Sequence, residues 1–181
     1  MRIAQSALIS LLVASPVMGE SHDPFAPTGD VAKGEKAFKK CIACHVVRDP
    51  DGNTLAGRKG KSGPNLYGLA GGTAGTVEGY KYGKSMIAAG QGSEDFAPLI
   101  WNEETFVGYV QDPKAFLRDY MQDPKARAKM TLRVRKEEDA VNLYAFLHSL
   151  APPAPAEEPA DASEETASEE ATREEASGES N

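Results

Sequence analysis

Near residue 30 the chain takes on the pattern of an amphipathic helix. Asp30 is a residue type that favours a helix N-cap. Apolar or small residues then recur on one face, at helical spacing, at Val31, Gly34, Phe38 and Cys41. The pattern therefore predicts a helix over residues 30–41.

Further helices are predicted in the second half of the chain. WNEETFVGYVQDP has Asn102 as its N-cap and ends near Pro113, where Asp112 and the proline begin another short helix through about Tyr120. KEEDAVNLYAFLHSL carries Leu and Phe residues at i, i+3, i+4 and i+7 and stops before Pro152. A shorter segment is expected around residues 85–89.

The segment between the first helix and these later helices shows no regular spacing of hydrophobic residues. Residues 48–83 read RDPDGNTLAGRKGKSGPNLYGLAGGTAGTVEGYKYG and are dense in Gly, Asp, Asn and Pro. No convincing strand pattern is present, so we predict an all-α, loop-rich domain. A loop this long needs something to enclose, such as a large apolar cofactor.

The N-terminal segment differs from the rest. Residues 1–19 begin with a single Arg, run apolar and end in Val-Met-Gly, the pattern of a secretory signal peptide cut after Gly19. The apolar run is shorter than the roughly 20 residues that span a bilayer. We expect export with cleavage, and an uncleaved membrane anchor is the alternative.

The C-terminal segment is strongly acidic. Residues 151–181 hold ten Asp and Glu against one Arg, a net charge of −9, and they contain no Leu, Ile, Val, Phe, Tyr or Trp. Such a segment cannot bury enough apolar surface to offset its ordering entropy, so we expect a disordered tail. Residues 20–150 carry 18 Lys and Arg against 17 Asp and Glu, a net charge of +1, and suffice for one domain.

The two cysteines of the chain lie in the sequence CIACH, as Cys41 and Cys44 followed by His45. A thioredoxin-type dithiol needs a βαβ context, and a structural zinc site needs four Cys or His ligands, whereas His22 and His148 lie far away in sequence. Cys-x-x-Cys-His is the attachment signature of a c-type haem, with the histidine on the iron. We favour the haem site, and a redox dithiol is the remaining alternative.

A haem attached in this way needs a second axial ligand or an open site. Met86 and Met121 fall in helical segments, where Met usually fills the core. His148 is expected at the solvated surface near the end of the last helix, and His22 is expected in a mobile N-terminal stretch. Met130 lies in the non-helical segment DPKARAKMTLRV, and this position favours it as the second axial ligand. Ordinary packing is its alternative role.

Several motifs together resemble one protein family. CIACH, GPNLYG, the W…EETF…Y…DP segment, AKMT and the final helix, over about residues 28–150, resemble the class I c-type cytochromes. The likeness is greatest to the larger bacterial members related to mitochondrial cytochrome c, which include soluble periplasmic carriers. The resemblance implies the class I cytochrome c fold, in which helices and long loops wrap around one covalent haem.

The resemblance assigns roles to individual residues. It implies one haem c per chain, bound covalently through Cys41 and Cys44, with His45 and Met130 as the axial ligands of the iron. Pro64, in the Gly-Pro-Asn-Leu motif, matches the residue whose carbonyl accepts the N–H of the ligand imidazole and fixes the orientation of the ring.

Aromatic residues of the later segments acquire roles in the same way. Tyr109 matches a tyrosine that hydrogen-bonds the ligand sulfur, and Tyr82 and Trp101 match residues that bond a haem propionate. Plain core packing is the alternative for all three. Gly34 and Phe38 match the pair that meets the last helix where the first helix crosses it.

An iron with both axial positions filled leaves no place for a substrate, so the resemblance implies a periplasmic one-electron carrier and not an enzyme. The expected partners are membrane redox complexes, with a cytochrome bc complex as donor and a cytochrome oxidase or photosynthetic reaction centre as acceptor. Docking is expected through Lys40 and Lys129, with Lys36 and Lys114 as neighbours. We expect a monomer and no nucleic-acid partner.

Two alternative functions share much of this chemistry. One is a dedicated electron acceptor for a single periplasmic dehydrogenase, which differs only in its partner. The other is a haem peroxidase or gas-binding sensor in which Met130 is absent from the iron or labile. The lengthened approach QDPKARAK to Met130 keeps the second alternative open.

Overall fold

The computed structural model describes residues 23–58 and 60–153. The whole of the expected signal segment, residues 1–19, and most of the acidic tail therefore lie outside the described residues. The elements in order are α1 (Val31–Phe38), β1 (Val46–Arg48), β2 (Thr54–Gly57), α2 (Lys84–Gln91), α3 (Glu103–Gln111), α4 (Pro113–Tyr120) and α5 (Glu137–Leu150). No helix among the described residues combines the length and apolar content needed to cross a membrane.

The helices begin where their N-cap side chains predict. The carboxylate of Asp30 accepts the backbone N–H of Lys33 at the start of α1, with an O–N distance of 2.8 Å. Asn102 and Thr105 form a reciprocal capping box at the start of α3. Asp112 caps α4, and the proline that follows occupies its first turn. These boundaries are confirmed because each one depends on residues within a few positions of it.

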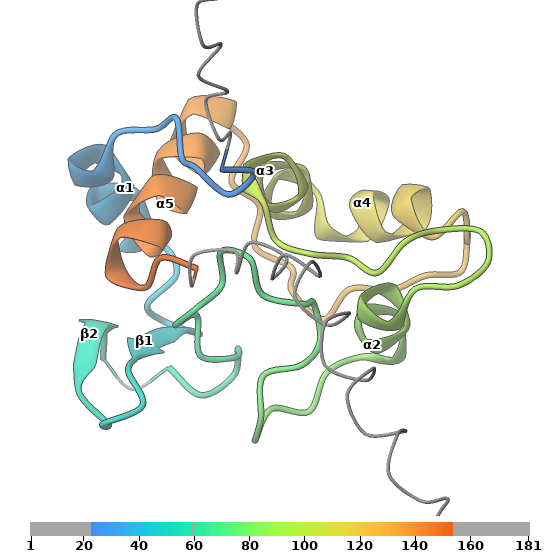
Figure 1. The fold of residues 1–181 in the computed structure, drawn as a ribbon, viewed down its shortest axis with the longest axis horizontal. Helices are drawn as coiled ribbons and strands as arrows, with labels where there is room; N and C mark the ends of the chain where they lie inside the picture. The colour runs from blue at the N-terminus through green and yellow to red at the C-terminus, as the bar shows by residue number, and fades with distance from the viewer. Residues whose placement is uncertain (1–22, 59, 154–181) are drawn as a thin grey trace, which may run out of the picture.

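The contact between α1 and α5 is the most extensive between any two of these elements (Figure 1). Gly34 makes it possible, because a Cβ at that position would lie 1.9 Å from the carbonyl oxygen of Asn142. One turn later the ring of Phe38 packs against Phe146, with centroids 5.4 Å apart. Asn142 is buried and accepts the backbone N–H of Asp30 at 2.7 Å. The predicted crossing of the first and last helices is confirmed.

The third helix extends this helical core. Phe106 of α3 packs against Tyr144 of α5, with ring centroids 5.7 Å apart. The hydroxyl of Tyr144 donates to the carbonyl of Phe25 at 3.0 Å, which ties the segment before α1 to the last helix. Burial raises the pKa of Tyr144 to about 12, so the phenol stays protonated and remains a donor at neutral pH.

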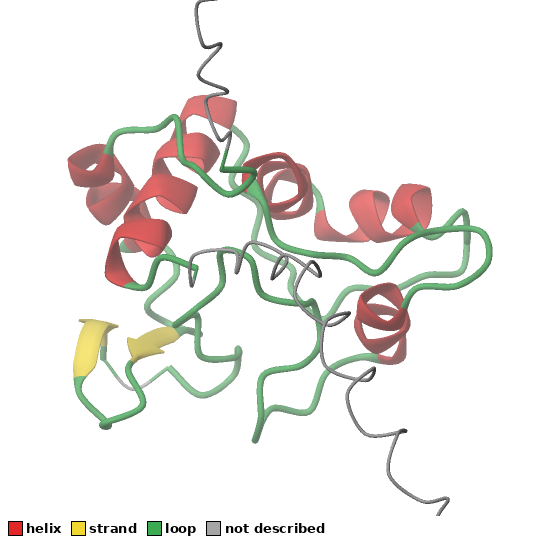
Figure 2. Ribbon diagram, viewed as in Figure 1, coloured by secondary structure: helices red, strands yellow, loops and turns green. Residues whose placement is uncertain are grey.

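A short antiparallel hairpin corrects the prediction that the chain contains no strand (Figure 2). β1 pairs with β2 in the register Val46↔Gly57 and Val47↔Ala56, with an irregularity before Arg48. Gly52 makes the turn at φ +88°, a conformation that favours glycine. The strands were missed because they hold three and four residues, too few for alternation to emerge from the sequence. The helical, loop-rich class is otherwise confirmed.

Changing Gly34 to Ala tests the helix crossing. The new Cβ would force the two backbones apart, and overpacking of this kind costs about 1–3 kcal/mol, equivalent to a loss of about 5–15 °C in Tm. Thermal unfolding of the purified protein measures the change. The control is Gly83→Ala, where the Cβ would meet only the side chain of Lys129, at 3.5 Å. Equal losses of stability in the two variants would contradict this account of the crossing.

Candidate functional site

An apolar cavity of about 330 Å³ lies between the helices and the loops. Phe38 of α1, Phe106 of α3 and Leu143 of α5 form its helical wall, and residues of the 62–83 and 127–134 segments form the opposite side. Its volume falls within the range of about 300–1,000 Å³ that is usual for ligand pockets. The unpatterned loop thus encloses a cavity, as its length led us to expect.

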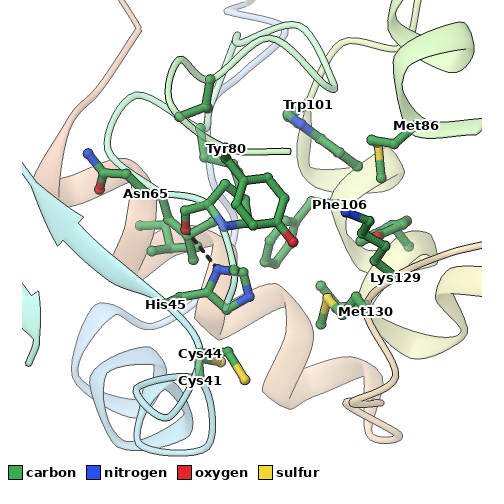
Figure 3. A pocket seen from close by; sticks show the side chains of 18 of the residues that line it. Cys41, Cys44, His45, Asn65, Tyr80, Met86, Trp101, Phe106, Lys129 and Met130 are labelled. Carbon is green, nitrogen blue, oxygen red and sulfur yellow. Dashed lines mark hydrogen bonds between the residues drawn. The ribbon is translucent and has the colours of Figure 1, made fainter. Parts of the chain in front are cut away.

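The Cys-x-x-Cys-His motif lies directly after α1 and lines this cavity (Figure 3). The carbonyl of Cys41 accepts the backbone N–H groups of Cys44, at 3.0 Å, and of His45, at 2.9 Å, so both thiols sit one turn apart. Neither cysteine is in a disulfide, and burial raises the pKa of Cys41 to about 11. The two thiols and the imidazole therefore meet on one wall.

The ring of His45 is fixed by the Gly-Pro-Asn-Leu loop. Its Nδ1 lies 2.9 Å from the carbonyl oxygen of Pro64, which can only accept, so Nδ1 carries the proton and Nε2 has a free lone pair. Gly63 lets the loop approach, because a Cβ there would lie 2.4 Å from Cε1 of the ring. Burial lowers the pKa of His45, which favours the neutral imidazole that a metal requires. The hydrogen bond predicted for Pro64 is present.

Two methionines line the cavity, and their positions differ. Met130 faces His45 across the cavity, whereas Met86 lies farther away beside Trp101 (Figure 3). Met121 packs on the hydrophobic core and is not among the cavity-lining residues. Among these sulfur atoms, that of Met130 therefore stands opposite the imidazole.

The three aromatic residues singled out in the sequence all line the cavity. Trp101 and Tyr109 pack against each other, with ring centroids 5.2 Å apart. Tyr82 approaches Tyr80 edge to face at 4.7 Å. Burial raises the pKa values of Tyr82 and Tyr109, so both phenols are neutral donors at physiological pH. These three side chains thus add O–H and N–H groups to the lining of an otherwise apolar cavity.

Three contacts at the cavity were missed by sequence reasoning. Tyr80 donates its hydroxyl to the carbonyl of Ser62 at 3.0 Å, and the ammonium of Lys129 lies 5.7 Å from the centre of the Tyr80 ring. The Lys129 ammonium also donates to the carbonyl of Lys81. These contacts link loops that are distant in sequence, so no local pattern could have indicated them.

The prediction for His148 is wrong. Its Nε2 is buried and has no hydrogen-bond partner among the described residues, whereas a solvated side chain was expected. The ring lies beside Tyr144, with centroids 6.3 Å apart, and it does not line the cavity. The second histidine considered as a ligand, His22, lies outside the described residues.

The donor set and the shape of the site suit a haem better than the other groups considered. The described residues contain no cluster of three or more His, Cys, Asp or Glu side chains able to hold a metal ion on their own. A flat apolar group fits a cavity that has two thiols on one wall and an imidazole and a thioether facing each other. Cys41 and Cys44 are placed to attach it.

Comparison with known proteins agrees with this reading. No protein-family model matches the chain. It is 56% identical to cytochrome c2 of Rhodovulum adriaticum over 123 residues, covering 68% of this chain and 94% of the relative. It is 38% identical to cytochrome c-550 of Paracoccus versutus over 149 residues, covering 82% of this chain and 93% of the relative.

Solved structures agree with these relatives. The crystal structure of cytochrome c2 from Rhodobacter sphaeroides matches with a TM-score of 0.65 and 49% identity, over 70% of this chain and 99% of that one. The structure of ferric cytochrome c-550 from Paracoccus versutus matches with a TM-score of 0.62 and 41% identity, over 68% of this chain and 99% of that one. The chain therefore belongs to the cytochrome c2 family of bacterial class I c-type cytochromes, electron carriers rather than enzymes, which bind one covalent haem c.

Proposed function

We propose that this carrier holds its haem iron between His45 and Met130 and works in the periplasm between membrane redox complexes. The observation that carries the proposal is the opposition of the His45 imidazole and the Met130 thioether across one apolar cavity, beside both cysteines. The bound haem supplies a group that takes up and releases one electron.

The residues of the site have separate roles in attaching the haem, orienting its ligand and setting its reduction potential. Cys41 and Cys44 fix the haem by thioether bonds, and the carbonyl of Pro64 keeps the His45 ring in the tautomer whose Nε2 can bind. A thioether ligand favours ferrous iron and raises the reduction potential, and the apolar wall acts in the same direction.

Three further cavity-lining side chains carry polar groups. Tyr82 and Trp101 offer an O–H and an N–H to the haem propionates, and Tyr109 offers its hydroxyl toward the ligand sulfur. If His45 and Met130 both held the iron, no position on it would be left for a substrate, which would favour the carrier over a peroxidase or gas sensor.

Basic side chains at the cavity opening suit an acidic docking partner. Lys40 and Lys129 both line the cavity and are exposed, although Lys40 also forms an ion pair with Asp139 at 3.3 Å. Lys114 lies on α4 and lines a separate surface groove, which makes it a poorer candidate. Positive charge at the opening steers association and raises its rate at low salt.

The sequence and the family support a proposal for the partners and the location. We infer a cytochrome bc complex as donor and a cytochrome oxidase or photosynthetic reaction centre as acceptor, with residues 1–19 directing export. The alternative is a single periplasmic dehydrogenase as the donor. The rates at which a purified cytochrome bc complex and a purified periplasmic dehydrogenase reduce the ferric protein discriminate between these two donors.

Replacing Met130 by Ala tests the sixth ligand. We expect the variant to lose the ferric absorption band near the red edge that reports iron–methionine bonding and to bind cyanide rapidly, because one axial position has opened. Met86→Leu is the matched control, since Met86 lines the same cavity, and it should keep the band. If the band survives in Met130→Ala, another residue is the sixth ligand. If the band is absent from the unaltered protein, the peroxidase or the gas sensor is favoured.

Ionic strength tests the docking surface. Stopped-flow oxidation by a purified acceptor complex should slow by about tenfold or more as salt rises from low to high concentration, because screening removes the steering. Lys129→Gln should weaken this salt dependence. Lys33→Gln, on the exposed side of α1 and ion-paired with Glu138, should leave it nearly unchanged. Rates that do not fall with salt would refute the steering.

A further inference from the structure

Five exposed basic residues gather beside the cavity opening on two chain segments that touch. The backbone N–H of Arg127 donates to Oγ of Ser85 at 3.0 Å, and the ammonium of Lys129 donates to the carbonyl of Lys81. Arg127 and Lys129 also line the cavity. We call this set the basic rim; it comprises Lys81, Lys84, Lys125, Arg127 and Lys129.

The basic rim lacks the acidic partners that other lysines have. The ion pairs among the described residues are Lys33–Glu138, Lys40–Asp139 and Arg133–Asp112, and none includes a member of the rim. Segments 81–85 and 123–129 contain one carboxylate, that of Asp123, which accepts the backbone N–H of Lys125. The rim is therefore a concentrated positive surface with little internal compensation.

The chain carries a segment of opposite charge that leaves the fold near the same cavity. Residues 154–181 hold ten Asp and Glu and one Arg. The last described residue, Pro153, lies against Gly71, where an added Cβ would be 2.9 Å from the proline Cβ. Gly72, the next residue along, lines the cavity. The acidic segment thus starts beside the loop that encloses the haem site.

The length of this segment is sufficient to reach the rim. An unstructured chain as long as residues 154–181 has a root-mean-square end-to-end distance of about 30 Å. A globular domain of the size described is about 35 Å across. Tethering then supplies an effective concentration in the millimolar range, which offsets the small contribution, about 0–1 kcal/mol, of each exposed ion pair.

We propose that residues 154–181 bind the basic rim of the same molecule as a polyanionic segment. The bound segment covers part of the surface assigned to acidic redox partners and competes with them at low salt. This competition rests on the proposed docking function, whereas the binding of the segment to the rim does not. High salt releases the segment because the contact is electrostatic.

Zero-length cross-linking tests the proposal directly. A carbodiimide joins carboxylates to amines only where they touch, and mass spectrometry identifies the linked residues. The sample is the haem-loaded full-length protein, mixed in equal parts unlabelled and ¹⁵N-labelled so that links within and between molecules are distinguished. At an ionic strength of about 10 mM, where the Debye length is about 30 Å, we expect links within one molecule from the acidic segment to rim lysines. At about 1 M salt these links should be lost.

Matched variants supply the controls. Lys81→Gln with Lys84→Gln should remove the links to those positions and reduce the total yield. Lys33→Gln with Lys39→Gln, which changes one exposed lysine of α1 and the exposed lysine at its C-cap, should leave the yield unchanged. Changing Glu164, Glu165, Glu169 and Glu170 to Gln should reduce the yield as well.

Two outcomes would overturn the proposal. Links spread evenly over the α1 lysines and the rim would show that the segment has no preferred surface. Links between differently labelled molecules would assign the rim to a second copy of the chain. If links map to the rim while Lys129→Gln leaves the salt dependence of partner oxidation unchanged, the proposed docking function fails and the binding of the segment stands.

Discussion

His45 is held between a helical turn and a loop 19 residues further along the chain, through a single hydrogen bond to Pro64. That contact requires Gly63, because any side chain there would meet the imidazole. It also requires the loop to be anchored, and Asn65 does this by exchanging hydrogen bonds with the backbone of Arg48 in β1, at 2.9 and 2.7 Å. The hairpin, the Gly-Pro-Asn-Leu turn and the haem motif therefore form one connected unit. The crossing of α1 and α5 then positions this unit against the helical core.

The two faces of the cavity come from different parts of the chain and differ in how they are supported. The His45 face is continuous with α1 and is backed by Phe38, which packs on Phe146. The Met130 face is a non-helical segment that depends on contacts of Arg127 and Lys129 with the 81–85 segment. Arg127 and Lys129 of the basic rim belong to this second segment, so the proposed docking surface and the proposed ligand Met130 would share one segment.

Local features of the sequence predicted local features of the structure. The N-caps at Asp30, Asn102 and Asp112 are correct because a cap is decided within three or four residues. The hairpin was not predicted because its strands are too short to show the alternation of apolar and polar residues. The burial of His148 Nε2 was not predicted because it depends on packing against Tyr144. The residues that the family resemblance assigned to the haem site all line the cavity, whereas aromatic spacing alone does not separate a cofactor pocket from an ordinary core. The partnering of Lys129 with Tyr80 and Lys81 required the folded chain.

The axial ligand opposite His45 is the central claim, and proton NMR of the reduced, haem-loaded protein tests it most directly. A methyl group held over the face of a porphyrin experiences the full ring current and resonates far upfield of other methyl groups. The account predicts one such methionine methyl signal, assigned by through-bond connectivity to Met130. A spectrum without a strongly shifted methionine methyl, or one in which that signal belongs to Met86, would contradict it.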